Sequence, residues 1–365
     1  MFKRFLVSFA TFFVTITAVN GQESDKKSPW YEAISLHGFL SAAYSYNFNI
    51  PDTMTNQYRV FDFDDNSMKI DVVGLSVRKD VVKPNETGFR IDVTAGSSVP
   101  KVAHSAGLDA GDLDFQQMLL SYIVPVGSGV RLDVGKFITG MGYEVIEGVD
   151  NHNDNYSRSF LFGYAIPFTH TGVKASYTFG ENITALLMVA NGWDNAIDNN
   201  KSKSVCSQIG IVPIHGLSFY TTYMVGPEKS GNNTDDRHVL DLAGSFTFNE
   251  NVTIGLNGDY GKEEHSGTNG GTATWIGVAG YARLNLLNTF SISLRSEQFE
   301  DRDGIRTGTV QKLREVTMTP EYRPAEQVVV RGDLRFDISD KVVFERGSGW
   351  KDAQTTLSLN FLYTF

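Results

Sequence analysis

The last nine residues of the chain place an apolar side chain at every second position and end on an aromatic ring: Leu357-Ser-Leu359-Asn-Phe361-Leu-Tyr363-Thr-Phe365. Successive side chains of a β-strand point to opposite faces, so this segment predicts a strand with one apolar face and a second face that carries Ser358 and Asn360. A strand at the end of a chain normally leaves an unpaired edge, which promotes aggregation. Pairing the last strand with the first closes the sheet and removes that edge. The segment therefore favours a closed membrane β-barrel over a soluble sheet.

Alternating runs of this kind recur along the whole chain and are bounded by turn-forming residues. They predict an all-β fold, a transmembrane antiparallel barrel of about 16 strands, and each run is close to the roughly 9–11 residues that a tilted spanning strand needs. The predicted strands cover residues 34–47, 67–80, 88–96, 113–124, 129–136, 172–180, 182–190, 205–212, 216–225, 237–248, 251–260, 273–286, 289–299, 311–322, 327–337 and 354–365.

The connections between these strands alternate in length. Short links are predicted at residues 125–128, 180–181, 213–215, 249–250, 287–288 and 323–326. Long links separate them, at residues 48–66, 97–112, 137–171, 191–204, 226–236, 261–272, 300–310 and 338–353. Short periplasmic turns and longer extracellular loops are typical of outer-membrane barrels. A soluble β-sandwich has no physical reason to keep this rhythm, so the alternation favours the membrane barrel.

Charged residues fall on one face of the predicted strands and apolar residues on the other. A lipid-facing Arg or Lys at the middle of the membrane costs about 2–4 kcal/mol, so these charges are expected to line an aqueous interior. The predicted pore wall consists of Arg90, Asp92, Arg131, Asp133, Arg295, Glu297, Arg331, Asp333, Arg335 and Asp337, and Asn257 and Asp259 follow the same pattern. Each of these arginines lies two residues from a carboxylate, so the same groups can instead be neutralised pairs that make the interior rigid.

The second predicted strand departs from this regular pattern. Ile70 and Val72 imply one parity, whereas Leu75 and Val77 imply the other. A single extra residue in a strand moves all following side chains to the opposite face. The change therefore predicts a β-bulge near Gly74.

The amino-terminal residues predict export. Lys3 and Arg4 precede an apolar and hydroxyl-bearing stretch at residues 5–19, which is shorter than the about 20 apolar residues of a membrane-spanning helix. This order is typical of a secretory signal peptide, with cleavage near Gly21. The predicted organisation is a signal peptide over residues 1–21, a short periplasmic segment over 22–33 and an outer-membrane barrel over 34–365. The segment 22–33 is too short for a plug domain, which argues against a TonB-dependent transporter.

Charge and composition exclude several classes of function. The formal net charge is −10, and removal of residues 1–21 leaves −12, whereas nucleic-acid binding needs a basic face. Acidic residues between the strands, such as Asp62 and Asp65, are expected to lie on loops that face lipopolysaccharide or at the pore mouth. The alternative is that they only make the protein soluble. Cys206 is the single cysteine, and the seven histidines show no metal-ligand spacing. We expect no metal and no cofactor.

Two blocks of sequence are distinctive. The first runs from Ser157 to Tyr177 and reads SRSFLFGYAIPFTHTGVKASY; the second, VANGWDN, runs from Val189 to Asn195. In these blocks the chain resembles the putative β-barrel porin-2 (OmpL-like) family of bacterial outer-membrane proteins. The resemblance implies a porin of the sixteen-stranded type. It implies no particular solute.

The longest predicted connection, residues 137–171, is the candidate constriction. Sixteen-stranded porins typically fold the loop at this position into the barrel, and here it carries acidic residues and one arginine: Glu144, Glu147, Asp150, Asp154 and Arg158. Carboxylates that face wall arginines across a narrow passage would favour cations. The alternative is a solvated external loop without effect on conduction. The apolar run at residues 160–168 is expected to pack against the barrel wall or to lie at the outer interface.

The function predicted from these features is a water-filled outer-membrane channel for passive diffusion of small hydrophilic solutes or ions, with a preference for cations. The first alternative is a loop-plugged barrel that acts as a surface receptor or adhesin. A barrel enzyme, for which His152 and Ser157 would be the nearest candidates, ranks below it, and we expect no enzymatic activity. The predicted partners are membrane lipid and lipopolysaccharide, periplasmic chaperones and the barrel assembly machinery, which would read Phe361, Tyr363 and Phe365. The sequence leaves open whether the protein forms a homotrimer.

Overall fold

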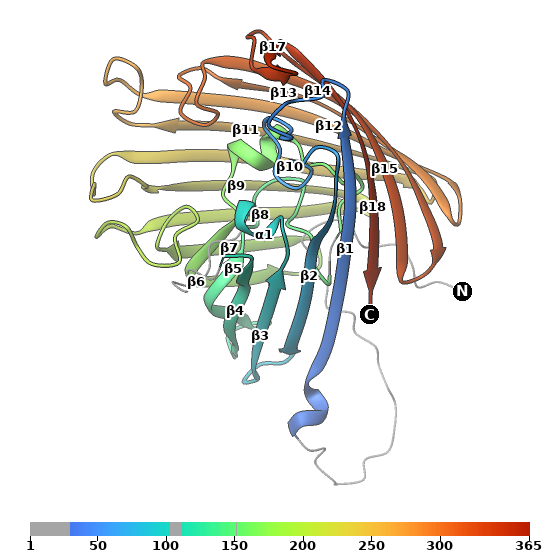
Figure 1. Cartoon of the computed structure of the whole chain (residues 1–365). Helices are drawn as coiled ribbons and strands as arrows, with labels where there is room; N and C mark the ends of the chain where they lie inside the picture. Colours follow the sequence, from blue (N-terminus) through green and yellow to red (C-terminus); the bar gives the residue numbers. More distant parts are fainter. Residues whose placement is uncertain (1–29, 103–110, 151) are drawn as a thin grey trace.

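The computed structural model describes residues 30–102, 111–150 and 152–365, and these residues form a closed antiparallel barrel of sixteen strands. The strands follow chain order around the barrel, from blue β1 to red β18, and β18 pairs with β1 to close it (Figure 1). The predicted fold class and strand number are confirmed. Residues 1–29, which include the predicted signal peptide, lie outside the described residues.

Every barrel strand begins and ends within three residues of its predicted position. The strands are β1 Ser35–Asn47, β2 Ser67–Lys79, β3 Thr87–Ala95, β4 Leu113–Val124, β5 Val130–Ile138, β6 Thr169–Phe179, β7 Ile183–Ala190, β8 Ser204–Ile214, β9 Leu217–Pro227, β10 Asp236–Asn249, β11 Val252–Glu263, β12 Ala273–Leu287, β13 Phe290–Asp301, β14 Gln311–Ala325, β15 Val328–Ser339 and β18 Ala353–Thr364. Five further short elements lie in the connections: η1 Trp30–Ala33, α1 Val99–Val102, η2 Leu161–Ala165, β16 Phe344–Arg346 and β17 Gly349–Lys351.

Burial along the strands separates an apolar outer face from a polar inner face. In β18, Leu357, Leu359 and Phe361 are exposed, whereas Ser358 and Asn360 are buried. The same contrast appears in β15, where the buried positions carry arginine and aspartate. The outer face of the barrel therefore presents apolar side chains to the lipid, and the polar side chains lie inside the barrel.

The seam between β1 and β18 continues to the last residue. The backbone N–H of Phe365 donates to the carbonyl oxygen of Gly38 at 3.0 Å, and the N–H of Gly38 donates to the carbonyl of Phe365 at 2.9 Å. The aromatic ring of Phe365 lies against Gly38, which offers no side chain in its way. These bonds satisfy backbone groups that would otherwise be unpaired at a sheet edge.

Local chemistry explains the short turns. Between β10 and β11, the side-chain Oδ1 of Asn249 accepts hydrogen bonds from the N–H groups of Asn251 and Val252 at 2.8 and 3.1 Å. Asn at such a position replaces a backbone acceptor and reverses the chain within two residues. Turns of this kind join the strands at one end of the barrel, and longer connections join them at the other, as predicted.

The predicted bulge lies in β2 but at a different residue. The pairing of β1 with β2 shifts between Ser41 and Ala42, which leaves Asp71 as the extra residue rather than a residue near Gly74. The buried Asp71 side chain turns inward and accepts hydrogen bonds from Ser41 and Ser98. Satisfaction of this carboxylate inside the barrel fixes the position of the bulge, which hydrophobic parity alone does not specify.

Candidate functional site: the inner loop and the pore wall

The loop between β5 and β6, residues 139–168, meets the barrel wall through buried ion pairs. Arg295 on β13 binds Glu144 of the loop, with 2.6 Å between Nη1 and Oε1. The same guanidinium donates to the carbonyl oxygen of Ser157 at 2.6 Å and to Glu315 on β14 at 2.8 Å. Glu144 and Arg295 are both buried. One wall arginine thus holds two separate points of the loop.

Arg331 on β15 makes the second connection. Its Nη2 lies 2.8 Å from Oε1 of Glu147, whose other oxygen lies 3.2 Å from Nη2 of Arg158 within the loop. Burial alone would raise the pKa of Glu147, but Arg331 and Arg158 hold that pKa below its ordinary value. Glu147 is therefore a buried, charged anchor between two guanidinium groups.

Wall carboxylates hold the backbone of the same loop. Asp333 accepts hydrogen bonds from the N–H groups of Tyr156 and Ser157 and from the Ser157 hydroxyl, at 3.1, 2.7 and 2.7 Å. Glu297 accepts from the N–H groups of Phe160 and Leu161, at the start of η2. These bonds satisfy donors at a helix start that would otherwise be buried without a partner.

The apolar half of the loop packs inside the barrel. Phe160, Leu161 and Phe162 are buried, and η2 contacts β11 and β12. The two distinctive sequence blocks meet at the end of this loop, where the carboxylate of Asp194 accepts from the N–H groups of Phe168 and Thr169 at 2.6 and 2.8 Å. The prediction that the apolar run packs against the barrel wall agrees with this burial.

Asp150 and Asp154 differ from the other two loop acids because their side chains retain access to water, with 33% and 22% exposed. Asp150 binds Arg78 on β2 and Arg90 on β3, each at 2.6 Å. Burial raises the pKa of Asp150, but the two arginines outweigh it and lower that pKa overall. Asp154 binds Arg283 on β12 at 2.6 Å. All four predicted loop acids are therefore paired with wall arginines.

The predicted wall arginines also bind the carboxylates two residues away on their own strands. Nε to carboxylate distances are 2.7 Å for Arg90 and Asp92, 2.9 Å for Arg131 and Asp133, and 2.7 Å for Arg335 and Asp337. Spacing by two places both groups on the same inner face, which explains this pairing. Arg295 and Arg331 instead reach other strands and the loop.

Sequence reasoning missed a second segment that enters the barrel, the connection of residues 48–66 between β1 and β2. Its Arg59 binds Asp62 in the same segment and Asp337 on β15. Asp62 and Asp65 are buried, so the expectation that they face lipopolysaccharide or the pore mouth is wrong. The sequence signal that this segment packs inward was the apolar pair Val60 and Phe61 next to Arg59. Both side chains are buried in the structure.

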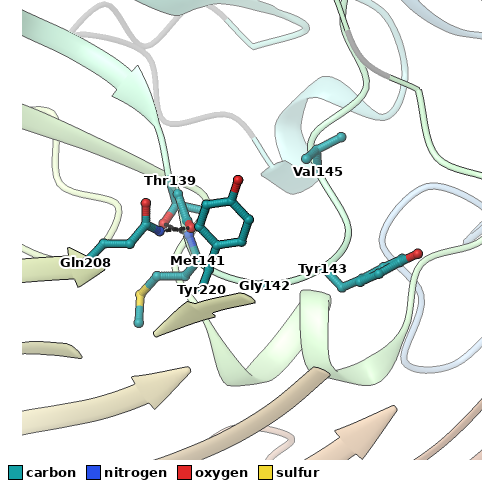
Figure 2. A pocket seen from close by; sticks show the side chains of 8 residues that line it. Thr139, Met141, Gly142, Tyr143, Val145, Gln208 and Tyr220 are labelled. Carbon is teal, nitrogen blue, oxygen red and sulfur yellow. Dashed lines mark hydrogen bonds between the residues drawn. The ribbon is translucent and has the colours of Figure 1, made fainter. Parts of the chain in front are cut away.

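A small cavity lies where the inner loop leaves β5. Its volume is about 20 Å³, and it is lined by residues 139–143 and 145 of the loop and by Gln208 and Tyr220 of the wall (Figure 2). Gln208 donates to the carbonyl oxygen of Gly140 at 2.7 Å. The space suits one or a few water molecules and is too small for an organic solute.

The described residues contain no group of three or more His, Cys, Asp or Glu side chains arranged to hold a metal ion. Among the same residues, no helix has the length and apolar character that crossing a membrane requires.

The sequence model of the family "Putative beta-barrel porin-2, OmpL-like" matches residues 33–365. No curated protein sequence matches the chain.

Several solved porin structures have the same fold. An anion-selective porin from Comamonas acidovorans is similar with a TM-score of 0.62 and 12% identity, over 91% of this chain and 99% of that one. The outer membrane channel DcaP of Acinetobacter baumannii is similar with a TM-score of 0.61 and 12% identity, over 91% of this chain and 97% of that one. OmpT of Vibrio cholerae, in a trimer form, is similar with a TM-score of 0.58 and 12% identity, over 91% of this chain and 99% of that one. At these identities the similarity shows the fold alone.

Proposed function

The chain belongs to the Putative beta-barrel porin-2, OmpL-like family, and we propose that its inner loop forms a constriction in an outer-membrane channel for small hydrophilic solutes and ions. Family and fold establish the coarser statement, an outer-membrane porin through which solutes diffuse. They also favour a channel over an enzyme. The observation that carries the finer proposal is the set of buried ion pairs that join Glu144 and Glu147 to Arg295 and Arg331.

These ion pairs explain why the loop would stay in place during transport. A buried charge without its partner is costly, so each pair resists separation once it has formed. The wall carboxylates Asp333 and Glu297 fix the loop backbone in addition. A loop held at so many points narrows the interior permanently rather than opening and closing with each solute.

Two kinds of acidic residue have different roles in this proposal. Glu144 and Glu147 anchor the loop, because both are buried and each binds a wall arginine. Asp150 and Asp154 reach water and supply the field that a passing ion meets. Because arginines pair with these acids too, the predicted cation preference is expected to be weak.

Reversal potentials across a potassium chloride gradient test this division. Neutralising Asp150 in the Asp150→Asn variant leaves Arg78 and Arg90 without their shared carboxylate, so selectivity is expected to shift toward anions. The variant Glu144→Gln is the matched control within the loop, and it is expected to alter current noise rather than ion preference. An unchanged reversal potential in Asp150→Asn would contradict the assigned role. A folded barrel that carries no current would instead favour the loop-plugged receptor.

We further propose that residues 1–21 are a cleaved signal peptide, which mass spectrometry of the outer-membrane form would test. Phe361, Tyr363 and Phe365 would serve as the recognition signal for barrel assembly, with chaperones and lipopolysaccharide as further partners. The trimer form of OmpT, a similar structure, supports a homotrimer, which crosslinking in the membrane would detect.

A further inference from the structure

The motif Gly192-Trp193-Asp194 of the second distinctive sequence block lies against the end of the inner loop. Besides accepting from the N–H groups of Phe168 and Thr169, Asp194 donates its own N–H to the carbonyl oxygen of Thr169 at 3.2 Å. Asp194 has a φ of +60°, a left-handed conformation that a short polar side chain tolerates. Such a conformation persists only where the surrounding structure holds it. The motif is therefore held tightly to the loop at this point.

The structure requires glycine at position 192. A Cβ atom there would lie 2.5 Å from Oε2 of Glu228, and this oxygen accepts a hydrogen bond from the N–H of Trp193 at 2.6 Å. The other oxygen of Glu228 accepts from the hydroxyl of Ser204 at 2.6 Å. These contacts fix the backbone of Trp193, whose indole ring is buried.

Two arginines from different parts of the chain meet the ring of Trp193. The guanidinium carbon of Arg306, in the connection between β13 and β14, lies 4.7 Å from the ring centroid, and that of Arg237, at the start of β10, lies 4.9 Å away. Arg306 also lies 5.3 Å from the centroid of Trp275 on β12, and the two indoles are 6.3 Å apart. Indole faces attract a guanidinium, and the attraction is stronger where water is excluded. We call these four residues the tryptophan–arginine stack.

The charges of the stack are not balanced equally. Arg237 binds Glu263 on β11 at 2.9 Å. Burial, and next to it the positive charge of Arg237, lower the pKa of Arg306 to about 10, so Arg306 is still charged at neutral pH. The two indole faces therefore matter most for Arg306.

The same stack satisfies the last carbonyl groups of η2. Nε of Arg306 donates to the carbonyl oxygen of Tyr164 at 2.6 Å, and Nε1 of Trp275 donates to that of Ala165 at 3.1 Å. The last carbonyl groups of a helix have no partner within the helix itself. The backbone N–H of Arg306 donates to the buried carboxylate of Asp301 at 2.9 Å, which fixes the position of Arg306. The stack thus holds the end of η2, a part of the loop that the ion pairs of Glu144 and Glu147 do not reach.

We propose that the tryptophan–arginine stack positions the apolar half of the inner loop, with Arg306 as its central residue, and so sets the size of solute that the channel admits. Arg306 contacts Trp193, Trp275 and η2, so it joins two extracellular connections and one strand to the loop. Without it, the carbonyl group of Tyr164 loses its donor and η2 is less firmly held against the wall. The inference rests on the proposed constriction, but it concerns the width of the passage, whereas Asp150 concerns the charge of the ions that pass.

Liposome swelling with sugars of increasing size, measured on the full-length barrel, tests this role. Arg306→Gln and Trp193→Ala are each expected to admit sugars that wild type excludes and to raise single-channel conductance. The reversal potential in a potassium chloride gradient is expected to stay the same in Trp193→Ala, because Asp150 and its arginines are unchanged. Arg302→Gln removes the same charge from the same connection and is the matched control, because Arg302 is largely exposed beside Glu300.

Trp275→Phe keeps an aromatic ring and removes only the donor to Ala165, so it keeps the proposal testable if a larger change prevents folding. It is expected to raise the size limit by less than Arg306→Gln, and heat-modifiable gel mobility shows which variants are folded. A wild-type size limit in every folded variant would overturn the proposal. An equal change in Arg306→Gln and Arg302→Gln would overturn it too, because charge alone would then explain the effect. Wild-type size limits together with a shifted reversal potential in Asp150→Asn would refute the stack and leave the proposed constriction intact.

Discussion

Arg295 is completely buried in the barrel interior, yet each nitrogen of its guanidinium group has an acceptor. Nε bonds Glu315, Nη1 bonds Glu144 and the carbonyl of Ser157, and Nη2 bonds the hydroxyls of Ser157 and Thr317. A planar fork of five donors suits this arrangement, and lysine has no equivalent geometry. At the scale of one residue, this charge is tolerated because every donor is satisfied.

Replacement of Arg295 is expected to be among the most damaging single changes in the barrel. Arg295→Gln leaves Glu144 buried without its cation and removes the nearer of the two arginines beside Glu315, at a cost of about 3–5 kcal/mol. Urea unfolding measured by heat-modifiable gel mobility checks the loss. Arg302→Gln is the control, because Arg302 is largely exposed beside Glu300 and is expected to change stability by less than about 0.5 kcal/mol. A wild-type midpoint for Arg295→Gln would refute the anchoring role of this residue.

The inner loop, taken as one element, contains a pH-sensitive contact. Arg323 on β14 donates to Nε2 of His152, with 2.6 Å between the nitrogens, so the imidazole is an acceptor and neutral. Burial and the positive charges of Arg323 and Arg331 lower the pKa of His152 to about 4. In the unfolded chain this histidine has its ordinary pKa of 6.5. The contact is therefore fully stabilising only above pH 6.5 and is lost as the pH falls toward about 4.

The stability of the loop is thus expected to fall in two stages on acidification. The first stage, between about pH 6.5 and 4, belongs to His152 and is expected to disappear in His152→Gln. The second stage belongs to Glu147 and Asp150, whose pKa values are lowered in the folded protein. Their contribution to loop stability is complete above the ordinary carboxyl pKa range, and it is lost as the pH falls through the lowered pKa values. Limited proteolysis of the loop from pH 8 to pH 3 measures both stages of the stability loss. A single stage, unaffected by His152→Gln, would exclude the histidine.

At the scale of the whole barrel, neighbouring strands come close together at two glycines that face each other on β5 and β6. Gly135 pairs with Gly172, and Gly135 has a φ of +138°. A Cβ atom on Gly135 would lie 2.1 Å from the carbonyl oxygen of Met118, and one on Gly172 would lie 2.2 Å from that of Val189. Both contacts are with backbone of the neighbouring strand, which cannot move away without breaking the ladder. The strands can approach this closely because no side chain is present.

Gly172→Ala is expected to strain this part of the barrel by about 1–3 kcal/mol and to lower the yield of folded protein. Gly280→Ala on β12 is the matched control, because the added methyl group would meet only Leu256, at 3.9 Å. Refolding yield and unfolding temperature of the two variants provide the comparison. Equal behaviour would show that the β5–β6 wall has room for a side chain.

The sequence by itself determined the strands, their faces and the rhythm of turns and loops. A period of two residues is a local property, and the membrane requires an apolar outer face, so Leu357 and Arg331 could each be assigned to a side without knowledge of their neighbours. The sequence also predicted that residues 137–171 carry the acids and the arginine of a constriction. Whether that segment restricts ion flow stays a prediction.

Only the tertiary structure decided which charges meet. Arg295 and Glu144 are 151 residues apart in sequence, and Arg331 and Glu147 are 184 apart. Such contacts depend on the path of the loop through the barrel, which alternation does not encode. The contact between Arg59 and Asp337, which are 278 residues apart, has the same origin. Each depends on how buried polar groups find partners across the closed interior, and strands distant in the chain supply those partners.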